Sequence, residues 1–199
     1  MVRVNHLKTL LEVLCLGFAT SYAAFADDRS SGNAASALPW EVGGPYQLTN
    51  QYGATRTQAD PNGRMQLVFF GYANCPGICS AALPMIADVA DALKDDEIAV
   101  TPVLITIDPT LDTVKTMGPP LRKWSDDFIG LTGSKEELSQ AYKGYNITFN
   151  KVMDDPEYGP IYAHSSFVFL ADSEGKVLTL VPPVLSFDDM LALVKRYAG

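Results

Sequence analysis

Two apolar runs on either side of a helical segment limit the fold more than any other feature of the sequence. Residues 64–72 (RMQLVFFGY) and 98–108 (IAVTPVLITID) are continuous apolar runs, as in strands buried on both faces. The apolar residues between them recur at helical spacing: Leu83, Ile86, Ala87, Ala90 and Leu93. A strand, a helix and a strand in this order predict a right-handed crossover and a parallel pair of strands.

The flanking segments add antiparallel strands. Residues 45–60 predict a hairpin around Tyr52-Gly53, and residues 165–181 predict a second hairpin with its turn at DSEG, residues 172–175. The sequence therefore predicts an α/β domain with a mixed central β-sheet.

Three further helices are expected on the two faces of this sheet. Residues 110–127 predict a helix that Gly118-Pro119-Pro120 kinks or divides. Ser134 and Glu137 form a capping box, and Ser186 is a good cap for a closing amphipathic helix over residues 187–199. These helices and the first one would flank the sheet.

The first 26 residues have the pattern of a secretory signal peptide. A positive start is followed by an apolar run, and Ala24-Phe25-Ala26 fits the small-x-small cleavage pattern. The apolar run after Glu12 has 14 residues, fewer than the roughly 20 of a membrane-spanning helix. We therefore expect export to the periplasm, cleavage after Ala26 and no stable membrane insertion, with an uncleaved anchor as the alternative.

The predicted domain boundaries follow from this. Residues 1–26 are the signal peptide, residues 27–44 are small, polar and Gly-rich and predict a flexible leader, and residues 45–199 form the domain. The chain has 15 basic and 23 acidic residues, a net charge of −8, and no basic patch. Nucleic acid is therefore excluded as a partner.

Cleavage would leave two cysteines, Cys75 and Cys79, in an oxidising compartment. Cys75 follows the first buried strand and Cys79 lies near the start of the next helix, at the sheet edge where sites tend to lie. A helix N-terminus favours a thiolate. A structural disulfide is disfavoured, because closing a loop of about five residues stabilises by only roughly 2 kcal/mol. Dithiol exchange and metal binding remain equally open on spacing alone.

His164 is the one histidine that cleavage would leave. It lies in IYAHSSFVFL, in the segment entering the last hairpin, and a lone histidine of this kind is commonly structural. In a thioredoxin-type layout, however, this segment faces the cysteines. Two thiolates and an imidazole suit copper, whereas a structural zinc site needs four ligands.

Four segments resemble the Sco/SenC family of copper-binding, thioredoxin-fold proteins: LVFFGYANCPGIC, VLITIDPTLDT, FIGLTGSKEEL and YAHSSFVFLADSEG. The resemblance covers about residues 45–195. It implies a thioredoxin-like fold, with Cys75, Cys79 and His164 as ligands of Cu(I) and of Cu(II). It also implies delivery of copper to the binuclear centre of cytochrome c oxidase subunit II, or thiol reduction of that binuclear centre. A copper donor chaperone is implied as a further partner.

The sequence departs from the family pattern at several positions. Gly77 and Ser80 stand in CPGICS where the family has Asp and Pro, Ala163 replaces the aspartate before the histidine, and Leu111 replaces a basic residue. The two missing carboxylates predict weaker Cu(II) binding. They weaken the case for the standard oxidase-assembly role but not for the site. The alternative function is a periplasmic thiol:disulfide oxidoreductase with Cys75 and Cys79 as its redox pair, so enzyme activity stays open.

Overall fold

The computed structural model describes Leu38 and residues 40–75, 77, 79–182 and 184–199. The predicted signal peptide and most of the predicted leader therefore lie outside the described residues. Within the leader, the backbone N–H of Gly43 donates to the carbonyl of Gly144 at 2.8 Å. Contact with the domain thus begins before Pro45.

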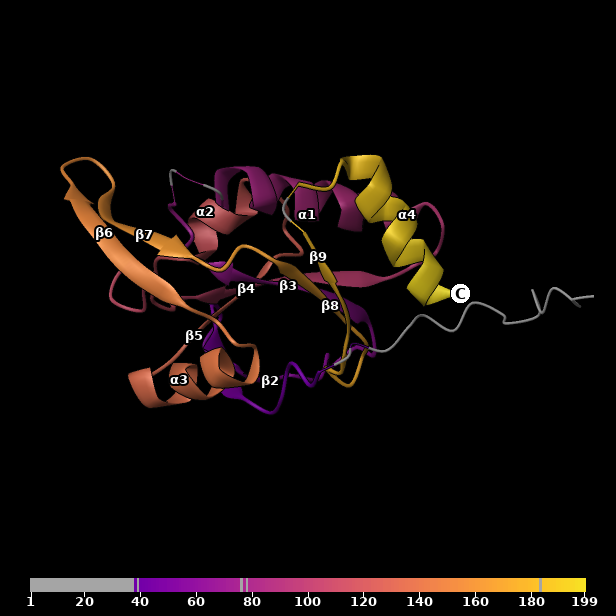
Figure 1. Ribbon diagram of the computed structural model, residues 1–199, viewed down its shortest axis with the longest axis horizontal. Coiled ribbons are helices and arrows are strands. Elements are labelled where there is room, and N and C mark those ends of the chain that lie inside the picture. The colour runs from indigo at the N-terminus through magenta and orange to yellow at the C-terminus, as the bar shows by residue number, and fades with distance from the viewer. Residues whose placement is uncertain (1–37, 39, 76, 78, 183) are drawn as a thin grey trace, which may run out of the picture. The chain divides into compact units, whose positions relative to one another are not determined.

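A seven-stranded sheet forms the centre of the domain, in the order β2-β1-β5-β4-β3-β8-β9 (Figure 1). β3 and β4 pair in parallel from Met65 opposite Val100 to Gly71 opposite Thr106, which confirms the predicted crossover unit. β5 is parallel to β4, whereas β1, β2, β8 and β9 are antiparallel to their neighbours. The predicted mixed sheet is confirmed. The strand bounds are β1 Gln47–Asn50, β2 Thr55–Thr57, β3 Met65–Gly71, β4 Val100–Thr106, β5 Ile129–Thr132, β8 Val168–Ala171 and β9 Val177–Val181.

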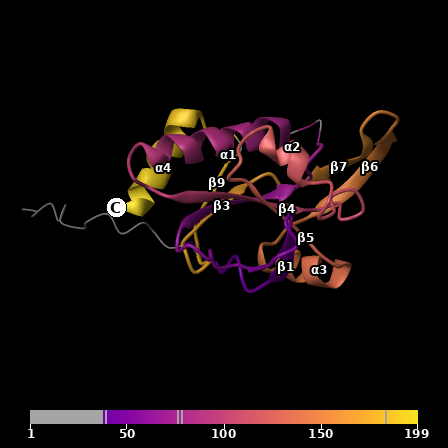
Figure 2. The same cartoon turned by 180° about the vertical axis from the view of Figure 1, so that it is seen from behind.

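Helices cover both faces of the sheet. α1 (Cys79–Lys94), α2 (Gly118–Arg122) and α4 (Phe187–Ala198) lie on one face, and α3 (Lys135–Gly144) lies on the other (Figures 1 and 2). Ser134 accepts a hydrogen bond from the backbone of Glu137 and completes the predicted capping box, while Ser186 caps α4 as predicted. The apolar stripe of α1 is buried, with Leu83, Ile86 and Leu93 at most 2% exposed.

The segment between β4 and β5 differs from the prediction. Of residues 110–127, only Gly118–Arg122 form an α-helix. Gly118-Pro119-Pro120 begins this helix instead of dividing it. Proline fits the first turn, where no backbone N–H is needed for a helical hydrogen bond. β5 was not predicted, because its four residues are too short to show a clear alternation.

A second, two-stranded sheet is an addition that the sequence did not predict. β6 (Phe149–Asp155) and β7 (Gly159–His164) form an antiparallel hairpin that projects from the domain (Figure 1). Most residues of β6 are exposed, so the strand lacks the alternation of buried and polar residues that marks a half-buried strand. His164 ends this hairpin at its base.

Candidate metal centre

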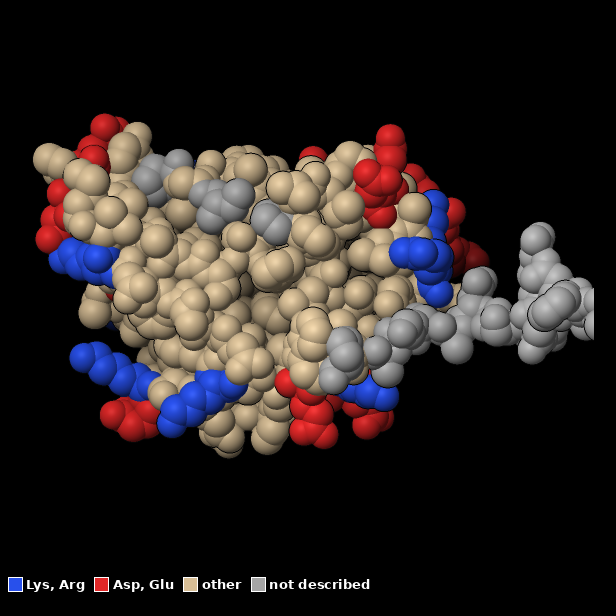
Figure 3. All heavy atoms as spheres, viewed as in Figure 1, with Lys and Arg blue, Asp and Glu red and all other residues tan. Residues whose placement is uncertain are grey.

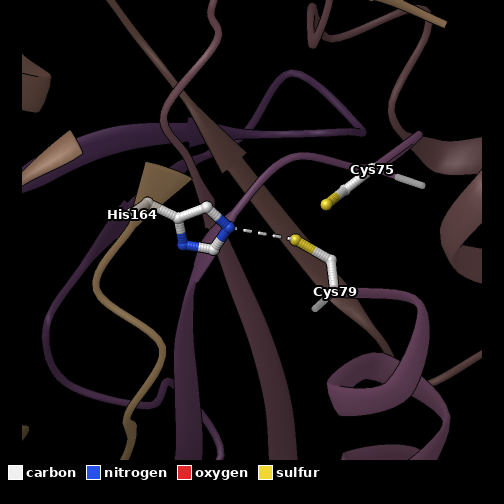
Figure 4. Close-up of side chains that lie close together, drawn as sticks. All are labelled: Cys75, Cys79 and His164. Atoms are coloured by element: carbon white, nitrogen blue, oxygen red, sulfur yellow. Dashed lines mark hydrogen bonds between the residues drawn. The ribbon is translucent and has the colours of Figure 1, made fainter. Parts of the chain in front are cut away.

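The structure brings Cys75, Cys79 and His164 together at the carboxyl end of β3. Cys75 lies in the turn after β3, Cys79 is the first residue of α1, and His164 is the last residue of β7. The two sulfurs and an imidazole nitrogen lie within 4.8 Å of one another and point toward a common space (Figure 4). His164 is thus held at the end of a strand that the sequence did not predict.

Gly71 makes room for the buried sulfur of this group. A β-carbon at Gly71 would lie 2.8 Å from Sγ of Cys79 and 2.8 Å from the ring of Phe69. Real β-carbons do not approach other atoms this closely, so any larger residue would displace the sulfur or the ring. The glycine that ends β3 therefore lets the first residue of α1 pack directly against the strand.

A backbone carbonyl orients the imidazole of His164. Nδ1 lies 2.8 Å from the carbonyl oxygen of Ser165, and Nε2 lies 3.5 Å from Sγ of Cys79. A carbonyl can only accept, so Nδ1 carries the proton and Nε2 keeps its lone pair directed toward the sulfur. The imidazole is thus held in the tautomer that a metal ligand requires.

The contact between Nδ1 of His164 and the carbonyl of Ser165 is relevant to the acidic residues that this chain lacks, because one of them would stand at position 163. Ala163 is exposed and pairs with Asn150, and successive side chains of a strand point to opposite faces. The side chain of Ala163 therefore points away from the face that carries His164. In this chain the carbonyl oxygen of Ser165 accepts the hydrogen bond that orients the imidazole of His164.

The two thiols differ strongly in acidity. The pKa of Cys75 is lowered, first by the hydrogen bond from the Cys79 thiol and further by a hydrogen bond from Tyr72. The pKa of Cys79 is raised by its hydrogen bond to Cys75 and by burial. In the metal-free protein the thiolate is therefore at Cys75. Cys79 is fully buried (0% exposed), and this burial opposes the thiolate that the helix N-terminus would favour.

Tyr72 is a supporting residue that sequence reasoning missed. Its buried hydroxyl accepts a hydrogen bond from the backbone N–H of Tyr162 at 3.5 Å and also contacts Cys75. The rings of Tyr72 and Tyr162 meet edge to face at 5.5 Å. Tyr72 thus joins the cysteine turn to the hairpin that carries His164. Within an apolar run, nothing in the sequence distinguishes this tyrosine from a core aromatic.

Asp112 is a second supporting residue that was missed. Its carboxylate accepts hydrogen bonds from the backbone N–H of Ala73 at 2.9 Å and from the hydroxyl of Thr106 at 2.8 Å. Burial raises the pKa of this carboxyl to about 6. Asp112 therefore fixes the turn that leads to Cys75. Nothing local in the sequence singles out Asp112, because Asp108 is the first acid after β4.

The chain matches the SCO1/SenC family over residues 34–199. It is 33% identical over 141 residues to an SCO2-like protein of Rickettsia felis, covering 69% of this chain and 68% of that protein. It is 30% identical over 141 residues to the mitochondrial SCO1 homolog of Homo sapiens, covering 69% of this chain and 46% of that protein.

Solved structures share the fold. Copper-bound ScoI of Arabidopsis thaliana matches with a TM-score of 0.72 and 28% identity, over 78% of this chain and 98% of that one. Copper-bound ScoI of Bradyrhizobium japonicum matches with a TM-score of 0.68 and 30% identity, over 78% and 99%. The predicted thioredoxin-like fold is confirmed by these likenesses, and the chain belongs to the SCO1/SenC family.

Proposed function

We propose that this protein binds copper on Cys75, Cys79 and His164 and carries it in the periplasm to a copper centre of an oxidase. The observation that carries the proposal is the convergence of two sulfurs and one imidazole nitrogen within 4.8 Å. Two related proteins of known structure, ScoI of Arabidopsis thaliana and ScoI of Bradyrhizobium japonicum, have copper bound. The donor set fits the metal, because thiolates are soft ligands and imidazole suits copper.

The residues around the centre favour Cu(I). Cys75 is already a thiolate and the imidazole of His164 already offers its free Nε2, so only Cys79 has to lose a proton when the ion binds. Gly77 and Ala163 supply no carboxylate to support a more highly charged ion. We therefore infer that Cu(I) is the principal form carried and that Cu(II) binds more weakly.

The recipient that we propose is cytochrome c oxidase subunit II, with a copper donor chaperone as the source. One structural relative, BsSco, is described as a member of a family of cytochrome c oxidase assembly proteins. The periplasmic location rests on the signal-peptide pattern of residues 1–26. Among the described residues, no helix has the length and apolar character that crossing a membrane requires.

A second candidate function is supported by the unequal thiols. Cys75 and Cys79 are both free, one as a thiolate and one as a thiol, which is the arrangement of an attacking and a resolving cysteine. The thiolate of Cys75 would attack a substrate disulfide, and the first substrate sulfur would leave as a thiolate. Cys79, after losing its proton, would then attack Cys75 and release the second sulfur. The substrate is reduced and the cysteine pair is oxidised.

Replacing His164 separates the two functions, because copper needs all three ligands while exchange needs only the sulfurs. We expect His164→Ala to lower Cu(I) affinity by at least about 100-fold, beyond the 10–100-fold typical of losing an outer-shell partner. Competition with a Cu(I) chelator measures this. The same variant should still cycle between dithiol and disulfide with a small dithiol, whereas Cys75→Ser should lose both activities.

Oxidase activity in cells that lack the wild-type protein then decides between the functions. The carrier function predicts that His164→Ala and Cys75→Ser both fail to restore copper-loaded oxidase. If His164→Ala restores the oxidase and Cys75→Ser does not, the protein acts as an oxidoreductase.

A further inference from the structure

One face of the molecule beside the metal centre is free of charged side chains. In Figure 3, the Lys, Arg, Asp and Glu residues of the described chain gather at the margins of the view, and its central part holds none. β8, β9 and the segment leading to α4 lie in this central part (Figure 1). A chain with 38 charged residues among 199 has no general reason to leave so broad a face uncharged.

The side chains of this face are apolar and partly exposed. A small hollow of about 50 Å³ lies between α1, β8, β9 and α4. Val184, next to one wall of this hollow, is 88% exposed, and Phe167, next to another, is 42% exposed. We call this surface the uncharged face and define it by six residues: Ala82, Met85, Phe167, Pro182, Val184 and Leu185.

The uncharged face is continuous with the metal centre. Ala82 lies in the first turn of the same helix that begins with Cys79, and Phe167 follows His164 by three residues. The sulfur of Cys79 is fully buried and Cys75 is 9% exposed. A ligand that takes copper from them must come within a metal–ligand bond, roughly 2 Å, of the ion. The protein that supplies this ligand must therefore cover the surface around the centre.

We propose that the uncharged face is the docking surface for the copper-accepting protein, which presents an apolar, uncharged surface around its own copper ligands. The inference rests on the proposed function and names the surface that this function uses. Charged residues are depleted in the cores of protein interfaces, as they are here. An apolar patch with a polar margin is the usual form of an interaction site.

The exposed middle of strand β6 in the β6–β7 hairpin is the rival docking surface. It exposes Val152 and Met153, at 63% and 53%, near the carboxylates of Asp154 and Asp155. The hairpin carries His164 at its base, and Val152 lies midway along β6, at the irregularity between the pairs Lys151–Tyr162 and Met153–Ile161. Because the hairpin projects from the domain, a partner seated on β6 alone would not cover the buried sulfurs (Figure 1). The two surfaces offer a matched pair of exposed valines, Val184 and Val152.

The test places one carboxylate on each surface. We compare Val184→Glu with Val152→Glu in the transfer of Cu(I) from the loaded protein to the soluble, copper-free domain of oxidase subunit II. Val184→Glu should slow transfer at least about tenfold, because an unpaired carboxylate buried in an interface is costly. Val152→Glu should stay within about twofold of wild type. Val184→Gln, which adds bulk without charge, should fall between them.

Both glutamate variants should keep wild-type Cu(I) affinity, which shows that the centre is intact. If Val184→Glu transfers copper as fast as wild type, or Val152→Glu is equally slow, the uncharged face is not the docking surface, while the proposed function stands. If wild-type protein binds Cu(I) and transfers none, the recipient in the proposed function is wrong, and this inference is wrong with it. If wild type is a dimer that Val184→Glu converts to a monomer, a second copy occupies the face and the inference is again wrong.

Discussion

Gly71 shows how one absent side chain shapes the metal centre. We expect Gly71→Ala to weaken Cu(I) binding, because its β-carbon would lie 2.8 Å from the sulfur of Cys79 and push it from the position that faces His164. Overpacking of this kind also destabilises a fold by about 1–3 kcal/mol. Chelator competition and urea unfolding measure the two effects.

Gly77→Ala is the matched control for this variant. A β-carbon at Gly77 would lie 3.7 Å from Sγ of Cys75, which is an ordinary contact. Both variants add one methyl group beside one sulfur of the centre, yet only the first creates a clash. Equal Cu(I) affinities for the two variants would show that the close packing at Gly71 does not position Cys79.

At the scale of elements, Asp112 ties the segment after β4 to the turn after β3 and makes this contact dependent on pH. Burial raises the folded-state pKa of Asp112 to about 6, with a further contribution from Asp108, against about 3.9 in the unfolded chain. The folded state therefore binds the proton more tightly, and the stability from this group falls as pH rises from about 4 to about 6. The full difference is about 3 kcal/mol.

Asp112→Asn removes this titration while keeping an oxygen for Ala73. The free energy of unfolding of the variant, minus that of the wild type, should therefore increase by about 2 kcal/mol between pH 4 and pH 7. Urea unfolding of both reduced, copper-free proteins at several pH values measures it, and other titrations cancel in the difference. Parallel stability curves over this range would contradict the prediction.

The elements that could be predicted are those with a local signal. The β3–α1–β4 unit was readable from two apolar runs and one helical stripe, and α3 and α4 from Ser134 and Ser186. The β6–β7 hairpin could not be predicted, because the residues of β6 are mostly exposed and the two strands are held by pairing with each other.

The residues of the candidate site could be predicted from the sequence, but their protonation states could not. The positions of Cys75 and Cys79 at a strand end and a helix start follow from the local pattern. The thiolate at Cys75 depends on the burial of Cys79, and the tautomer of His164 depends on one backbone carbonyl. Both are properties of the packed structure, which residue spacing does not contain.

At the scale of the whole molecule, cleavage of the signal peptide determines the N-terminus of the protein that carries the metal centre. We expect the exported protein to begin at Asp27, because Ala24-Phe25-Ala26 fits the cleavage pattern. N-terminal sequencing and intact mass of the periplasmic protein measure this. Ala24→Glu, which breaks the small-x-small pattern, should instead leave a longer chain in the membrane fraction. Recovery of the wild-type protein from washed membranes with Met1 in place would refute the prediction.

His164 lies on the β6–β7 hairpin, whereas the cysteines lie at the start of α1 and in the turn before it, so a bound metal ion and a disulfide would cross-link different parts of the chain. A bound ion would close a loop across the 85 positions that separate Cys79 from His164, whereas a Cys75–Cys79 disulfide closes only a tight turn. In the chain-entropy estimate, the longer closure removes roughly 4.5 kcal/mol of unfolded-state freedom and the shorter one roughly 2 kcal/mol. Loading with copper therefore fastens the hairpin to the domain, and oxidation does not.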